Sequence, residues 1–128
     1  MKILFIILII AFFGREGCLS SPEEPQPEAY PVGSYTINNI MVDRRSVSFD
    51  LTCGVPNPCY IYAHTEYVVS GDAVDITVYT RPRSNDPCIA ILGAIDVEVE
   101  VFLPHRGDYR FTFHGVWSSS DTLVTVNY

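Results

Sequence analysis

Apolar and polar residues alternate almost throughout from Gly33 to the end of the chain, and this period of two limits the fold more than any other feature. The clearest runs are residues 46–52, 95–103 and 109–114, where apolar side chains alternate with Ser, Thr, Asp, Glu and Arg. Alternation of this kind gives a β-strand one apolar and one polar face. No run in the sequence shows helical periodicity of useful length, so we expect an all-β chain.

Turn-forming Gly, Pro, Asn and Asp residues divide this region into about seven expected strands. These strands cover residues 34–42, 46–52, 59–69, 74–78, 95–103, 109–114 and 122–127. Residues 33–128 are enough for one domain with its own core and too few for two. Seven short strands in a chain of this length are typical of an immunoglobulin-like, antiparallel β-sandwich.

One local motif supports the sandwich. Gly107 and Tyr109 open the penultimate strand, and Gly-x-Tyr at that position resembles the tyrosine corner of Greek-key sandwiches, in which the phenol bonds back to upstream backbone. Tyr109 is therefore expected to be structural. If Leu103 and Tyr109 both face inward, Glu98 and His114 would pair on an exposed face, which usually means only a solvated sheet surface.

The N-terminal residues have the pattern of an export signal. Lys2 is followed by eleven apolar residues, 3–13, which are fewer than the roughly 20 that a membrane-spanning helix needs. We therefore expect residues 1–17 to be a signal peptide and the protein to be exported.

Cys18 follows this segment and is the candidate site of lipid attachment. The Gly17-Cys18 step and the small residues after it resemble the end of a bacterial lipoprotein signal, which is cleaved before a cysteine that then carries acyl chains. Such chains would anchor the protein to a membrane. Arg15 and Glu16 stand where that signal usually has Leu and a small residue, so cleavage after Ser20 is the open alternative.

The residues after Cys18 are acidic and rich in proline. Four Pro and three Glu between residues 19 and 32 predict that residues 18–32 carry the lipid and form a disordered, extended linker. From Cys18 onward, six Arg and no Lys face fourteen Asp and Glu, a net charge of about −8. This balance argues against nucleic acid and anionic lipid surfaces as partners, because both need a basic footprint.

The sequence contains no pattern that commits to catalysis or metal binding. His64 and Glu66 share a strand face, but neither a zinc spacing nor an EF-hand loop accompanies them. There is also no G-x-S-x-G nucleophile motif. We therefore expect no enzyme, no metal, no cofactor and no small-molecule substrate.

The order of motifs in residues 57–128 resembles a set of uncharacterised bacterial lipoproteins with a small immunoglobulin-like domain. The matching features are Cys59 before an aromatic strand, then GDAVDITVYTRP, DPCIA, DVEVEVFLP, G-x-Y-x-F-x-F-x-G and DTLVTV. The resemblance implies a lipid anchor in the cell membrane or outer membrane, facing the periplasm or exterior, and no activity. It also implies a disulfide between Cys59 and Cys88.

The residues themselves favour the same bridge and leave one alternative open. Closing the loop between Cys59 and Cys88 stabilises a fold by about 3 to 4 kcal/mol in the chain-entropy model, more than the short loop from Cys53 to Cys59. Cys53 also falls on the same strand face as the apolar residues in 46–52, so we expect it to be a small buried apolar side chain. The short loop stays as the alternative pairing.

Loops at the ends of a sandwich are where such folds carry recognition. We expect a non-catalytic binding or structural module whose loops 53–59, 81–87 and 115–121 meet a protein or polymer. Tyr60 and Trp117 are the candidate aromatic anchors, because aromatic side chains dominate binding hot spots. The alternative role for Trp117 is to cap the core.

The alternative function is a secreted, immunoglobulin-fold peptidase inhibitor that acts through its end loops. The GVPNPC loop at residues 54–59 contains two prolines, which would hold it in a preorganised conformation. This alternative requires loops 55–58 and 115–121 to lie at the same end of the domain.

Overall fold

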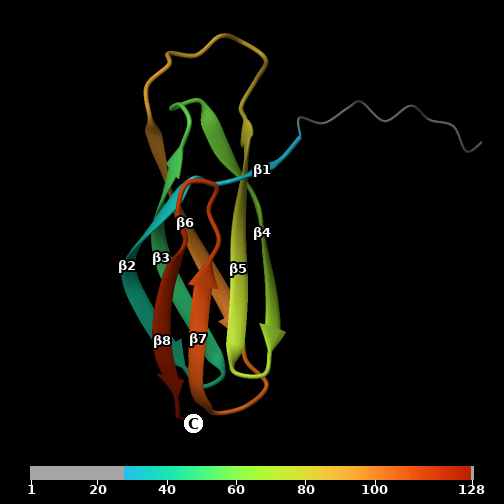
Figure 1. The fold of residues 1–128 in the computed structure, drawn as a ribbon, viewed down its shortest axis with the longest axis vertical. Helices are drawn as coiled ribbons and strands as arrows, with labels where there is room; N and C mark the ends of the chain where they lie inside the picture. The colour runs from blue at the N-terminus through green and yellow to red at the C-terminus, as the bar shows by residue number, and fades with distance from the viewer. Residues whose placement is uncertain (1–27, 128) are drawn as a thin grey trace, which may run out of the picture.

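The computed structural model describes residues 28–127, which fold as eight strands in two sheets packed face to face (Figure 1). The strands are β1 Tyr30–Pro31, β2 Ser34–Asp43, β3 Ser46–Val55, β4 Tyr60–Ser70, β5 Ala73–Pro82, β6 Gly93–Phe102, β7 Gly107–Phe113 and β8 Ser120–Val126. One sheet contains β2, β3 and β6, and the other contains β1, β4, β5, β7 and β8. The expected all-β sandwich is confirmed, with β1 as an additional strand.

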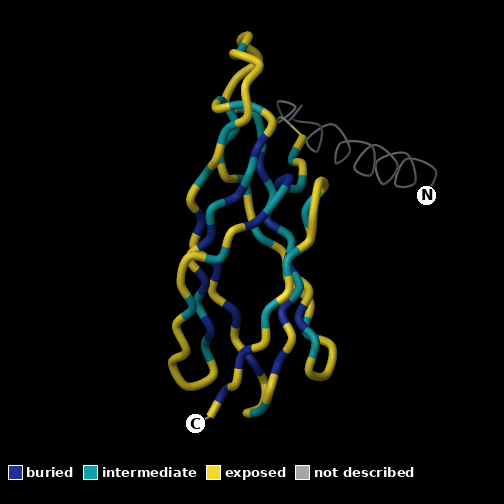
Figure 2. Tube along the Cα trace, turned by 60° about the vertical axis from the view of Figure 1, so that its left-hand side comes forward, coloured by how far each residue is buried: buried dark blue, intermediate teal, exposed yellow. Residues whose placement is uncertain are grey.

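The core lies between the sheets and is formed by the inward positions of the alternating runs. Figure 2 shows buried and exposed residues alternating along the strands. The Phe49 ring meets the rings of Phe111 and Phe113 edge-on, with centroid distances of 4.8 and 5.1 Å, a favourable geometry for aromatic pairs. Full burial of each such side chain contributes about 1.5–3 kcal/mol, so the sequence alternation directly accounts for the core.

The pairing of β5 departs from the expected antiparallel pattern. β4 pairs with β5 along one side, while β7 pairs with residues 73–76 on the other side and β1 pairs with Tyr79 and Thr80. The pair of β5 and β7 is parallel. The reason is that the chain leaves this sheet after β5, runs back along β6 in the other sheet, and returns as β7 in the original direction. The predicted antiparallel sandwich thus contains one parallel pair, while the other strand pairs are antiparallel.

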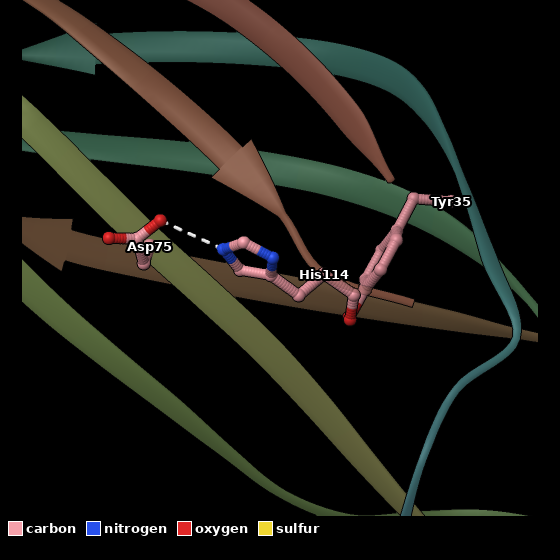
Figure 3. A network of polar contacts seen from close by, with 3 residues as sticks. All are labelled: Tyr35, Asp75 and His114. Carbon is pink, nitrogen blue, oxygen red and sulfur yellow. Dashed lines mark hydrogen bonds and ion pairs between the residues drawn. The ribbon is translucent and has the colours of Figure 1, made fainter. Parts of the chain in front are cut away.

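One hydroxyl group completes the hydrogen bonding of β5 where β7 ends and β1 begins. The Val78 amide lies between the residues paired with β7 and those paired with β1, and it donates to Tyr35 Oη at 3.0 Å. This hydroxyl in turn donates to the main-chain oxygen of His114 at 2.8 Å, and the Tyr35 ring points toward His114 in Figure 3. Tyr35 comes from β2, so it joins the two sheets through the core. Its burial raises the pKa of the phenol from 10.0 to about 12.

The domain begins earlier than the predicted boundary at residue 33. Tyr30 pairs with Thr80 and Pro31 with Tyr79, and Val32 is fully buried. The assignment of residues 18–32 to a disordered linker was therefore wrong for its last residues, because a backbone that hydrogen-bonds to β5 adds a buried valine to the core. The predicted signal peptide at residues 1–17 and the lipidated Cys18 lie outside the described residues.

The turn between β6 and β7 has the features expected of a tyrosine corner. Tyr109 is almost fully buried, and its hydroxyl donates to the main-chain oxygen of His105 at 2.8 Å. Gly107 has a φ of 142°, in a region that only glycine adopts readily. Leu103 is also buried.

The expected pairing of Glu98 with His114 was wrong. β6 and β7 belong to different sheets, so Glu98 lies opposite Asp50 on β3. His114 instead contacts Asp75 of β5, with 2.8 Å between Nε2 and Oδ1 (Figure 3). A short turn between two strands does not require them to be neighbours, because in a sandwich it can also carry the chain from one sheet to the other.

Candidate functional site

Three connections of the domain lie together at the end opposite the C-terminus. They are residues 56–59 between β3 and β4, 83–92 between β5 and β6, and 114–119 between β7 and β8 (Figure 1). The segment between β1 and β2 ties two of them together.

Gly33 is the centre of this tie. Its amide donates to the Gly54 oxygen at 2.8 Å, and its oxygen accepts the amides of Trp117 at 2.8 Å and Ser118 at 3.2 Å. Val116 likewise donates to the Val32 oxygen at 3.0 Å. Loops 55–58 and 115–121 therefore share one end of the domain.

Trp117 is held in position by close packing against glycine residues. A Cβ at Gly33 would lie 2.2, 2.3 and 2.5 Å from three neighbouring ring atoms of Trp117, Cε3, Cδ2 and Cζ3. Nearly equal distances to three adjacent atoms mean that the glycine backbone lies against the face of the indole. A Cβ at Gly115 would lie 2.4 Å from the oxygens of Gly33 and Ser118. The chain needs glycine at both positions for Trp117 to cover the backbone with one face while half of its surface, 51%, stays exposed.

A cavity of about 240 Å³ opens beside Trp117. The side chains of Tyr30, Tyr60 and Trp117 supply its aromatic lining, and Pro31, Gly33, Pro56, Thr80 and Val116 complete it. The structure thus brings together the two aromatic anchors expected from the sequence, Tyr60 and Trp117. Tyr30 was missed because its neighbours are prolines and glutamates; the apolar Val32 that follows it was the available signal that the domain starts there.

The Cys59–Cys88 disulfide predicted from the sequence is confirmed. It ties the long β5–β6 loop to the loop that precedes β4. Cys53 is a free, buried cysteine, so the alternative pairing of Cys53 with Cys59 was wrong. Burial raises the pKa of the Cys53 thiol from 9.0 to about 12, which keeps this sulfur protonated and unreactive at neutral pH.

Four consecutive apolar residues, 89–92, follow the disulfide and are all exposed. The exposed fractions of Ile89, Ile91 and Leu92 are 65%, 59% and 75%. We call residues 89–92 the apolar tip. A loop was predicted at residues 81–87 but the tip was missed, although an apolar run between turn residues and a strand was a visible signal.

The polar groups near the cavity are few. The Tyr30 hydroxyl donates to a Glu28 carboxylate oxygen at 3.3 Å, and the charge of Glu28 raises the pKa of Tyr30 above its usual value of 10.0. The Thr80 hydroxyl, which also lines the cavity, donates to the Tyr30 main-chain oxygen at 3.3 Å. The lining is therefore apolar and aromatic with hydroxyl groups, which suits stacking and apolar contact.

His64 lies outside the lining of the cavity. His64 stacks on Tyr79 with ring centroids 4.6 Å apart and lies 3.4 Å from Glu66. Desolvation, and secondarily Glu66, raise the pKa of Tyr79. Within residues 28–127, no group of three or more His, Cys, Asp or Glu side chains is placed to hold a metal ion.

Residues 28–127 include no helix with the length and apolar character required to span a bilayer. Comparison with known proteins gives no match to a family model, a curated protein or a solved structure. The resemblance to bacterial lipoproteins consequently stays a prediction.

Proposed function

We propose that this protein is a membrane-anchored lipoprotein of the cell envelope and acts as a non-catalytic binding module. The anchor is Cys18, and the acidic, proline-rich segment after it tethers the domain to the membrane. The binding end is the one at which Tyr30, Tyr60 and Trp117 surround a cavity. That convergence is the observation that carries the proposal, because it turns three aromatic side chains from separate segments into one surface.

The size of the cavity indicates the kind of partner. Small-molecule sites typically measure about 300–1,000 Å³, whereas this cavity has about 240 Å³. It accommodates a single side chain or ring rather than an entire elongated ligand. The partner is therefore a protein or polymer that inserts one projecting group between the aromatic side chains. Trp117 is already held by Gly33, so little side-chain entropy is lost on binding.

Site-specific photocrosslinking in intact cells tests this proposal. A photoreactive residue replaces Tyr60 at the cavity or, as a matched control, Tyr67, which is exposed on the same strand but outside the cavity lining. We expect a discrete adduct from position 60 only, and we expect Trp117→Ala to remove it. Equal adducts from both positions, or none from position 60, would refute binding at the cavity.

The anchor is tested separately by the intact mass of the protein recovered from a membrane fraction. We expect a chain that begins at Cys18 and carries acyl groups. A chain that begins at Ser21 without acyl groups would refute the anchor and leave a released domain.

A peptidase inhibitor is the second candidate, and one observation favours it. Loops 55–58 and 115–121 lie at the same end, joined through Gly33, as insertion of adjacent loops into a cleft requires. The prolines of the first loop limit its conformations. The test is a panel of envelope and secreted peptidases. An inhibitor gives saturable inhibition of one of them and stays uncleaved. Inhibition of none of the peptidases would refute this candidate for the panel.

A further inference from the structure

The apolar tip is the most exposed group of large apolar side chains on one loop. Residues 88–93 contain no charged or hydrogen-bonding side chain, and Ile89, Ile91 and Leu92 are each more than half exposed. Single exposed apolar residues are ordinary on protein surfaces, but contiguous ones mark contact sites. The fold itself does not need these side chains, because none of them belongs to the core cluster.

Both ends of the tip are fixed to the same neighbouring loop. Cys88 is bonded to Cys59 just before the tip begins. Gly93 follows the tip, and a Cβ there would lie 2.9 Å from backbone atoms of Asn57 and Pro58. Only glycine permits this close approach. The four apolar residues are thus held out from the domain between two attachments, which reduces the entropy lost when they meet a partner.

The tip also lies at the end where the chain joins the domain. Figure 1 shows the β5–β6 loop extending beyond the other loops at the end opposite the C-terminus, and β1 lies toward this end. Cys18 precedes Glu28 by only ten residues, a span of at most about 35 Å. An anchor at Cys18 therefore keeps the tip within reach of the membrane.

We propose that the apolar tip inserts into the bilayer that carries the anchor. This inference rests on the proposed function for the anchor at Cys18. A projecting loop cannot enclose a ligand, but it can penetrate the headgroup region and bury its aliphatic side chains among the acyl chains. The acyl chains at Cys18 hold the protein on the membrane, and an inserted apolar loop adds a second, independent contact that fixes how the domain lies on it.

The negative net charge of the chain determines which kind of lipid surface the domain can approach. The net charge of the chain is negative, so an anionic surface repels the domain while a zwitterionic surface does not. Insertion also sets the orientation of the domain: the cavity beside Trp117 stays close to the membrane surface, where a partner in the envelope can reach it.

A fluorescence experiment on the full chain tests the proposal. The protein is recovered from membranes and reconstituted into phosphatidylcholine vesicles with brominated acyl chains, which quench tryptophan inside the bilayer. One variant carries Leu92→Trp in the tip and the control carries Leu123→Trp, because Leu123 is equally apolar and 69% exposed on β8. Trp117 is the only native tryptophan, and its emission is subtracted using the parent protein.

We expect a blue shift and strong quenching for Leu92→Trp and neither for Leu123→Trp. If the two variants are quenched alike, or if the Leu92→Trp emission is that of a solvated residue, the tip does not insert. Ile89→Trp repeats the test from a second tip position should the first variant fold poorly.

The intact mass of the same sample reports on the anchor independently. Acylated protein without selective quenching refutes the tip and leaves the anchor in place. Selective quenching of a chain without acyl groups, mixed with the same vesicles, supports the tip and refutes the anchor.

Discussion

Replacement of Tyr35 by phenylalanine removes one oxygen atom that connects the two sheets. That oxygen accepts the Val78 amide at 3.0 Å and donates to the His114 oxygen at 2.8 Å. The ring packs against Phe113 at a centroid distance of 5.4 Å, and Tyr35→Phe preserves this contact. The variant therefore isolates the polar contribution.

The magnitude follows from the two main-chain groups that lose their partner. Each buried group without a hydrogen bond costs about 1–3 kcal/mol, so we expect the free energy of unfolding at pH 7 to fall by about 2–6 kcal/mol for the two groups together. Urea denaturation of the two proteins measures this difference. Tyr67→Phe, at an exposed position, is the control and should stay within about 0.5 kcal/mol of the parent. A Tyr35→Phe change as small as the control would contradict the proposed role of the hydroxyl.

The same hydroxyl makes the free energy of unfolding depend on pH. The pKa of Tyr35 is 10.0 in the unfolded reference and about 12 in the folded protein, so folding favours the neutral phenol. The raised pKa stabilises the folded state by about 2–3 kcal/mol below pH 10. This stabilisation is lost as the pH rises through about 12. The stability gap between the parent and Tyr35→Phe should therefore narrow between these pH values. A constant gap would show that Tyr35 does not titrate as described.

Three further outcomes are expected. Cys53 is buried with a raised pKa, so at pH 8 a thiol reagent should modify it only as denaturant unfolds the protein, and rapid modification in native conditions would disagree. Replacing Cys59 and Cys88 together by serine should lower the free energy of unfolding by about 3 to 4 kcal/mol for a bridge that spans 29 residues, measured by denaturation. Gly33→Ala places a methyl group within 2.2 Å of the Trp117 ring, so the Trp117 emission should shift to the red, and an unchanged spectrum would mean that the ring does not lie on Gly33.

The sequence could predict every strand except β1, chiefly because apolar and polar residues alternate along most of them. In residues 46–55 the alternation is continuous, and the structure buries Val47, Phe49 and Leu51 as the pattern requires. The pattern specifies which face of a strand is buried, but not the sheet to which the strand belongs. The relation of β6 to β7 was therefore predicted incorrectly, and the parallel pairing of β5 with β7 was not predicted.

The candidate site could be predicted only in part for a related reason. Tyr60 and Trp117 could be found because large aromatic residues in a loop or directly beside one can be noticed singly. Their meeting with Tyr30 depends on contacts through Gly33, which lies 84 positions before Trp117 in the chain. Contacts made by glycine leave no pattern in the neighbouring residues, so sequence periodicity cannot reveal them.

The two ends of the sandwich differ in a way that the fold alone does not require. At the C-terminal end, hairpins turn at Arg44 and Gly71, both with positive φ, in the few residues that connected strands need. At the other end, the chain uses two longer loops, 83–92 and 114–119, together with a disulfide and glycines at close contacts. If the strands only had to be connected, short turns would serve at both ends. The additional structure instead holds the aromatic cavity and the apolar tip in fixed positions, which is why we place recognition and membrane contact at this end.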